Sequence, residues 1–346
     1  MTEISRDLLR LLPKAELHCH LDGSVRSQTL LELAAERDVV LPGHSAAQLH
    51  EYMIVRDAAN LEDYLARFSV TLSVMQDAVA LERIARELVV DAAHEGVRYI
   101  EIRYSPVLNT QEGLSLDEAV EAPLRGIAAG TFETGTVGRL IICALRHLDP
   151  SVSSELARLA VAYKHHGVVG FDLAGGELGH PASRHVESFT YAHAHDLAVT
   201  VHAGEGDGAD SVREAVHVCG ANRIGHATRL FEDQPLSQYV NDRRIALEIC
   251  LTSNVQTRVV QSYETHPLRS YYQHGQMVVL NTDNRLMSGV TLTDEYAHAA
   301  SSLGFTFREL AQVARNGFES AFASWHDRRT MLDTFDRELP SLLSQA

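Results

Sequence analysis

Short runs of apolar and β-branched residues recur along the chain, with room for at least one helix between successive runs. The segments between them repeat apolar residues at three- and four-residue spacing, as in LERIARELVVDAAHEG (81–96), where the closing Gly96 is typical of a helix C-cap. Alternation of this kind predicts parallel strands joined by helices. Eight runs are strand candidates: KAELHCHL (14–21), VRYIEIRY (97–104), GRLIICAL (138–145), VVGFDLA (168–174), AVTVHA (198–203), NRIGHA (222–227), IALEICL (245–251) and MVVLNTD (277–283).

The number of strand candidates and their nearly continuous apolar character favour a (β/α)8 TIM barrel. In an open doubly wound sheet a glycine-rich phosphate fingerprint would be likelier. We therefore expect one barrel domain over residues 1–346. About 75 residues separate the first two strand candidates, far more than one crossover helix requires. This insertion, which contains NLEDYLARFSV (60–70), predicts additional helices over the C-terminal mouth of the barrel.

Composition narrows the classes of partner. The 45% hydrophobic and 22% charged residues are typical of a globular protein with a large core. The formal net charge of -16 repels phosphate backbones and anionic membrane surfaces, so neither a nucleic acid nor a membrane is expected as a partner. The four cysteines form no CxxC pair, the first residues do not show a basic region followed by an apolar signal core, and no apolar run approaches the length of a membrane span. These features predict a reduced, cytoplasmic protein, and no pattern indicates an oligomeric state.

Unusual polar residues occur at the carboxyl ends of strand candidates, where parallel barrels carry their catalytic groups: His18, His20, His202, His226 and Asp283. Residues i and i+2 of a strand share a face, so His18 and His20 should both point toward the barrel axis. Taken alone, such a pair could equally be buried core histidines, and Asp283 could cap the following helix. Three of these histidines together with the aspartate suit Zn²⁺ with an open position for water. Such a site is typical of a hydrolase.

Two further groups, Glu205 and His226, are expected beside the metal without binding it. Glu205 lies three residues after His202 in VHAGEG (201–206). A hydrolase needs a proton donor and a group that orients or deprotonates the attacking water. The structural alternatives are an ion pair for Glu205 and a core hydrogen bond for His226.

Seven segments of the chain resemble those of the adenosine deaminases in order and spacing. They extend from about residue 13 to residue 325: AELHCHLDGS, IEIRYSP, FDLAGGE, VHAGE, RIGHA, SNV and LNTDN. The resemblance implies a (β/α)8 barrel with one zinc ion. It also implies hydrolysis of adenosine and 2′-deoxyadenosine at the 6-amino group to inosine-type products and ammonia, as in purine salvage. A small-molecule purine nucleoside is then the expected partner.

The resemblance also assigns roles to residues. It implies the zinc ligands His18, His20, His202 and Asp283, and the catalytic residues Glu205, His226 and Asp283. Glu205 resembles the proton donor to purine N1, and His226 resembles the partner of the attacking hydroxide. The implied substrate-binding residues are His20, Asp22, which resembles the contact to the ribose 5′-hydroxyl, Gly175, whose backbone resembles the contact to purine N3, and Asn284.

Tyr64 and Phe68 resemble an apolar gate over the nucleoside, although an ordinary amphipathic helix would also bury them. Three positions depart from the family pattern: Asn284 replaces the aspartate that faces purine N7, Ala227 replaces a glycine, and Leu251 replaces a proline. None of them is an implied ligand, so the departures bear on substrate choice. Asn284 is the one that leaves room for a substrate other than adenosine.

Other functions remain open from the sequence. Within the same chemistry, the substrate could be a modified adenine nucleoside such as aminodeoxyfutalosine, or free adenine, although free adenine would leave Asp22 without a ribose contact. A two-metal amidohydrolase would carry a bridging lysine on the fourth strand, which VVGFDLAG lacks. A cytidine-deaminase-type enzyme would show PCxxC after an HxE motif, and the sequence has none. A non-catalytic nucleoside-binding protein is disfavoured because every implied ligand and proton-handling residue is present.

Overall fold

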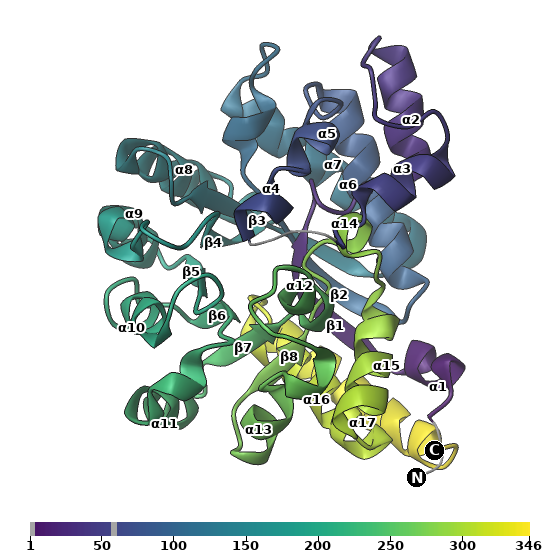
Figure 1. Cartoon of the computed structure of the whole chain (residues 1–346), viewed down its shortest axis with the longest axis vertical. Helices are drawn as coiled ribbons and strands as arrows, with labels where there is room; N and C mark the ends of the chain where they lie inside the picture. Colours follow the sequence, from purple (N-terminus) through teal and green to yellow (C-terminus); the bar gives the residue numbers. More distant parts are fainter. Residues whose placement is uncertain (1–3, 57–60) are drawn as a thin grey trace.

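The structure, a computed structural model, describes residues 4–56 and 61–346. Within these residues eight parallel strands form one sheet in the order β1 to β8 (Figure 1). The strands are β1 Lys14–His20, β2 Val97–Tyr104, β3 Val137–Leu145, β4 Val168–Ala174, β5 Ala198–Ala203, β6 Arg223–His226, β7 Ala246–Ile249 and β8 Val278–Leu280. All eight strand candidates are thereby confirmed.

The first and last strands meet and nearly close the barrel. Cys19 pairs with Asp283 in a parallel bridge, and the His20 backbone N–H donates to the Asp283 carbonyl at 2.7 Å. Strand β8 is shorter than its apolar run because the Asn281 side chain takes over the pairing. Its Oδ1 accepts the backbone N–H groups of Leu17 and His18 at 2.7 and 3.1 Å. The expected (β/α)8 TIM barrel is confirmed.

Helices surround the strands, as Figure 1 shows for α8 to α11 and α13. The crossovers between β2 and β8 each carry at least one of them, as the strand–helix alternation predicts. The helices of the described residues are α1 Arg6–Leu11, α2 Ser27–Glu36, α3 Ala46–Met53, α4 Leu61–Leu65, α5 Phe68–Leu72, α6 Ala78–Ala93, α7 Leu116–Thr134, α8 Pro150–Ala162, α9 Val186–Ala194, α10 Ala209–His217, α11 Gln234–Asp242, α12 Leu251–Gln256, α13 Leu268–Gln273, α14 Arg285–Ser288, α15 Leu292–Leu303, α16 Phe307–Ser320 and α17 Trp325–Leu343.

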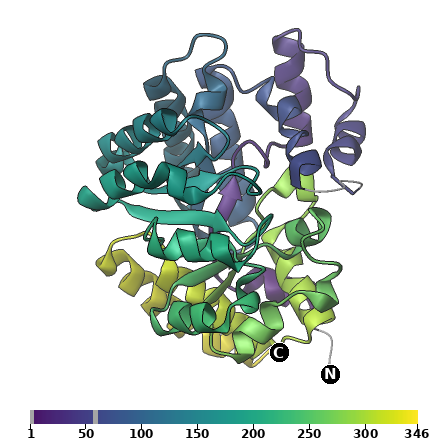
Figure 2. The same ribbon diagram turned by 60° about the vertical axis from the view of Figure 1, so that its left-hand side comes forward.

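The long insertion between β1 and β2 forms α2 to α6, and Figure 2 shows its first helices at one end of the molecule. The segment 60–70 contains α4 and the start of α5, so the expected additional helices are present, and Asn60 lies outside the described residues. The predicted helix over 81–96 is α6. Beyond it, Gly96 has φ +77°, and a Cβ there would lie 2.3 Å from the Arg10 carbonyl oxygen. Only glycine fits this turn into β2.

No helix among the residues that the structure describes combines the length and the apolar character needed to cross a membrane.

Candidate active site

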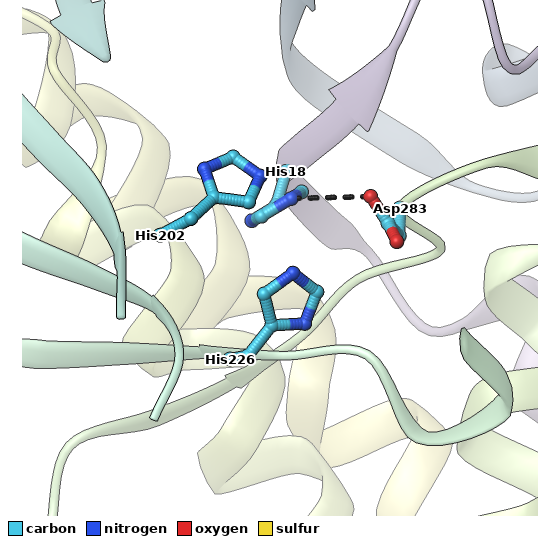
Figure 3. A group of neighbouring side chains, drawn as sticks. All are labelled: His18, His202, His226 and Asp283. Atoms are coloured by element: carbon cyan, nitrogen blue, oxygen red, sulfur yellow. Dashed lines mark ion pairs between the residues drawn. The ribbon is translucent and has the colours of Figure 1, made fainter. Parts of the chain in front are cut away.

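Four side chains converge at the carboxyl ends of the strands and point toward one another (Figure 3). His18, His202 and His226 come from β1, β5 and β6, and Asp283 follows β8. All four are buried, and one potential ligand atom from each lies within 4.8 Å of those of the others. Imidazole nitrogens and a carboxylate are the donors that Zn²⁺ favours, so this cluster could hold a metal ion.

His20 reaches the same point from β1. Its Nε2 lies 3.2 Å from Nε2 of His202 and 3.4 Å from Oδ1 of Asp283. Nε2 of His18 lies 3.2 Å from the same carboxylate oxygen. The two histidines of β1 therefore both face the cluster, as their i, i+2 spacing predicts. Five side chains thus surround one small volume.

Two buried carboxylates fix the orientation of the histidine rings. Nδ1 of His18 lies 2.9 Å from Oε2 of Glu248, and Nδ1 of His202 lies 3.1 Å from Oδ2 of Asp172. Each Nδ1 then donates its proton to a carboxylate, which leaves Nε2 with a free lone pair. Nε2 of His18 makes no hydrogen bond among the described residues and faces Oδ1 of Asp283 at 3.2 Å. Metal-binding histidines usually donate the N–H of their other ring nitrogen to a carboxylate in this way.

These carboxylates belong to a charged network that the sequence analysis did not identify. Arg103 on β2 donates to Asp172 at 3.0 Å and to Glu248 at 2.9 Å, and all three side chains are fully buried. Burial alone would raise the pKa of Glu248, but the positive charges of Arg103 and Arg223 lower it below its usual range. The signal in the sequence was the presence of charged residues within three otherwise apolar strand candidates.

Glu205 and His226 lie side by side at the edge of the cluster, with Oε2 and Nε2 3.4 Å apart. Burial, followed by the negative charges of Asp283 and Glu177, raises the pKa of Glu205 well above its usual range. A carboxyl group with a raised pKa keeps its proton to higher pH than an ordinary glutamate, which suits it to donate a proton. His226 makes a core hydrogen bond through its other nitrogen, Nδ1, which lies 3.0 Å from Nδ2 of Asn254.

Glu177 holds the loop that carries Glu205. Its carboxylate accepts backbone N–H groups from Gly204 at 2.7 Å, Glu205 at 2.9 Å, Gly206 at 2.6 Å and Asp207 at 3.2 Å. The last residue of FDLAGGE thus restrains the backbone on both sides of Glu205. This role was not expected from the sequence, because it depends on the proximity of two loops.

Three non-glycine residues at the site have left-handed backbone conformations. They are His226 (φ 62°), Ala227 (φ 53°) and Asp283 (φ 60°). Each such residue costs roughly 1–3 kcal/mol, and such residues cluster at functional sites. Asp283 is not a helix cap, because Asn284 occupies the N-cap position of α14.

A cavity of about 340 Å³ opens next to the cluster, within the range of small-molecule sites. Tyr64 and Phe68 line it, with Tyr64 fully buried and its hydroxyl 3.1 Å from Oγ of Ser288. The implied site residues that line the same cavity are His20, Asp22, Gly175, His202, Glu205, His226, Asp283 and Asn284. Of the sequence-predicted site residues, His18 alone is not part of the cavity wall, because it lies beneath it and is fully buried.

Two polar residues of the cavity wall have unused oxygen atoms. Oδ1 of Asp22 and Oδ1 of Asn284 are buried without hydrogen-bond partners in the described part of the chain. Burial raises the pKa of Asp22 to about 7. Although Asn284 is the N-cap residue of α14, its side chain makes no capping hydrogen bond. A Cβ atom on Gly23 would lie 1.8 Å from Oδ1 of Asn284. Gly23 therefore leaves space for the Asn284 side chain.

Leu251, the departure from a proline, uses the backbone N–H that proline lacks. This N–H donates to Oε2 of Glu295 at 2.7 Å. Helix α12, which begins at Leu251, carries Ser253 and Asn254, which bond Asp283 and His226. The departure therefore changes how α12 is held and leaves the cluster intact.

Comparisons with known proteins agree with this arrangement. A model of the family described as adenosine deaminase matches residues 13–338. A probable adenosine deaminase of Dictyostelium discoideum is 42% identical over 322 residues, which span 92% of this chain and 42% of that protein. An adenosine deaminase of Clostridium kluyveri is 35% identical over 329 residues, which span 95% of this chain and 94% of the relative.

A solved structure of an adenine deaminase from Arthrobacter aurescens resembles the chain with a TM-score of 0.89 at 27% identity. The alignment covers 95% of this chain and 99% of the other. The similarity to named deaminases over most of the chain shows an enzyme that hydrolyses a C–N bond of adenosine or a related adenine compound, with a small-molecule purine as its ligand. The chain belongs to the adenosine deaminase family.

Proposed function

We propose that this enzyme is a zinc-dependent adenosine deaminase of purine salvage, built as one domain and located in the cytoplasm. Its substrates are adenosine and 2′-deoxyadenosine, and its products are the corresponding inosines and ammonia. The observation that carries the proposal is one cavity beside the His/Asp cluster, whose wall also carries Glu205, with its raised pKa, and the oxygen acceptor of Asp22. In this proposal Glu205 contacts the purine base, the metal cluster faces the reacting amino group, and Asp22 contacts the ribose.

The proposed zinc ligands are His18, His20, His202 and Asp283, with one ion per chain. The donor set fits zinc, since three imidazoles and one carboxylate converge, with Nε2 of His18 and Nε2 of His20 both near Oδ1 of Asp283. The carboxylates of Glu248 and Asp172 already hold the Nδ1 atoms of two ligands. When bound, the metal would supply the Lewis acidity that lowers the pKa of a water molecule to about 7.

The other residues bind the nucleoside and move protons. Glu205 donates a proton to purine N1, where electron density accumulates as the nucleophile adds to C6. His226 holds the attacking oxygen, and the backbone of Gly175 contacts N3. Tyr64 and Phe68 cover the base and exclude water.

Asp22 tests whether the ribose is recognised. Its Oδ1 is buried without a hydrogen-bond partner in the described part of the chain, which supports a role as acceptor of the 5′-hydroxyl. A hydrogen bond to a charged group contributes about 1.5–3 kcal/mol. Above its pKa of about 7, where Asp22 is ionised, we expect kcat/KM for adenosine to exceed that for 5′-deoxyadenosine by roughly 10- to 100-fold. The Asp22→Ala variant should process both compounds at nearly equal rates. If Asp22→Ala instead lowers kcat/KM by the same factor for both compounds, Asp22 does not bind the 5′-hydroxyl.

Asn284 tests recognition of purine N7. Its amide can donate to the N7 acceptor without titrating, which the family's aspartate cannot do once ionised. We expect Asn284→Ala to lower kcat/KM for adenosine by about 1–3 kcal/mol. On 7-deazaadenosine, which lacks the acceptor, the variant and the parent should be nearly equal.

Asn284→Asp is the matched control for this contact. It should remain active and acquire an alkaline-side loss of kcat/KM as the new carboxyl group ionises. An equal loss for Asn284→Ala on adenosine and on the deaza analogue would show that Asn284 does not contact N7.

Free adenine is the second candidate substrate, because the chain resembles an adenine deaminase structure. Ammonia release from adenosine, 2′-deoxyadenosine, adenine, aminodeoxyfutalosine and cytidine separates the alternatives in one panel. We expect the two nucleosides of adenine to give the highest kcat/KM. A higher value for adenine would overturn the proposed substrate while leaving the deaminase assignment in place.

A further inference from the structure

His226 is the end of a buried chain of hydrogen bonds that leads away from the cavity. The backbone N–H of Leu268 donates to Nδ1 of His266 at 3.0 Å. Nε2 of His266 lies 3.2 Å from Oδ1 of Asn254, and Nδ2 of Asn254 lies 3.0 Å from Nδ1 of His226. The three side chains are buried, with 3%, 0% and 1% of their surfaces exposed.

The backbone N–H of Leu268 determines which atoms donate and which accept in this series of hydrogen bonds. Leu268 is the first residue of α13, where a backbone N–H has no partner within the helix and must find another acceptor. A peptide N–H can only donate, so Nδ1 of His266 must accept and cannot carry a proton. Burial lowers the pKa of His266 to about 3, so its ring is neutral at pH 7. Its single proton therefore lies on Nε2.

The orientation of the asparagine follows from this proton. Nε2–H of His266 requires an acceptor, and the amide of Asn254 offers only Oδ1. The amide nitrogen must then face Nδ1 of His226, where it donates. A proton on Nδ1 of His226 would meet the amide donor at 3.0 Å, so both the Nδ1–H tautomer and the doubly protonated ring are disfavoured.

We infer that His266 and Asn254 are positioning residues that fix His226 as its Nε2–H tautomer. The cavity then receives an N–H donor from His226, 3.4 Å from Oε2 of Glu205, rather than a lone pair. A metal ligand must present a lone pair. His226 is therefore excluded as a zinc ligand although it belongs to the convergent cluster, and His20 completes the set. The role of this donor in deamination rests on the proposed function, whereas the tautomer itself does not.

The tautomer can be measured directly in the full chain, with its metal, by nitrogen NMR of protein labelled with 15N-histidine. Protonated and bare ring nitrogens have well-separated shifts, and the His226 signals are identified by their absence in His226→Gln. We expect a protonated Nε2 and a bare Nδ1. A protonated Nδ1 with a bare or metal-shifted Nε2 would overturn the inference.

The Asn254→Asp substitution should reverse the hydrogen bond to His226, and aspartate has nearly the same shape as asparagine. A carboxylate accepts from both neighbours, so Nδ1 of His226 should gain a proton. Loss of a preorganised donor in an active site typically lowers kcat by about 10²–10³-fold, and we expect a decrease of this size with KM little changed. Asn316→Asp is the matched control, since Asn316 is also buried but bonds only the Val278 carbonyl and Gln312 within the described residues. It should leave the His226 spectrum unchanged.

His266→Phe covers the case in which Asn254→Asp does not fold. It keeps a ring in place but removes the donor that orients Asn254, so Nδ1 of His226 should become partly protonated. An unchanged His226 spectrum in both variants would show that the chain does not set the tautomer. Since the spectra require no substrate, a wrong substrate assignment would leave this result intact, and an altered spectrum with unchanged kcat would refute only the role in catalysis.

Discussion

Removal of the metal should abolish the deamination of adenosine, and one equivalent of zinc should restore it. Four donors converge on one point, and without a Lewis acid there the attacking water keeps its ordinary pKa and remains a weak nucleophile. We expect kcat to fall by at least roughly 10⁴-fold after treatment with a chelator. Elemental analysis of the purified protein should find one divalent ion per chain.

Substitution of Asp172, whose carboxylate contacts Nδ1 of His202, should weaken the metal site without removing a ligand. Asp172→Asn should weaken zinc binding by about 10- to 100-fold, because it removes the acceptor that orients the ring. Asp196→Asn is the control, since Asp196 is exposed and its left-handed conformation also suits asparagine. Two equivalents of metal, or full activity without any, would contradict the single-metal site.

Glu205→Gln should retain zinc and nucleoside binding but lose most of its turnover. Glutamine has the same shape but cannot transfer a proton to N1, and general acid catalysis typically contributes about 10²–10⁴-fold. We expect a loss of at least that size in kcat, with KM changed much less. Glu155→Gln, on the exposed surface of α8, is the matched control and should behave like the parent.

The pH profile checks the same role. Burial raises the pKa of Glu205, so kcat should fall on the alkaline side as this carboxyl group loses its proton. That decline should disappear in Glu205→Gln. A variant with kcat within a few-fold of the parent would show that Glu205 has a structural role only.

Most of the fold was predictable because its signals are local. Each strand candidate is a short apolar run, and eight such runs separated by helical patterns favour a barrel. The ends of elements were less predictable. β8 ends at Leu280 because the Asn281 side chain bonds β1, and the segment 60–70 divides into α4 and α5. Such ends depend on partners that are distant in the sequence.

The site residues were predictable because polar groups at strand ends stand out against apolar runs. His18, Glu205 and Asp283 were identified in this way. The groups behind them were not, since Asp172 and Glu248 meet their histidines only after the barrel closes. The same holds for the tautomer of His226, which depends on a backbone N–H at the start of α13.

The most direct test of the central claim is a zinc titration of the metal-free protein, followed by ammonia release from adenosine. A single convergent site predicts that activity rises linearly and reaches its plateau at one equivalent of zinc, with inosine and ammonia formed in equal amounts. A plateau at two equivalents, or zinc binding without ammonia release from adenosine, would contradict a one-zinc adenosine deaminase.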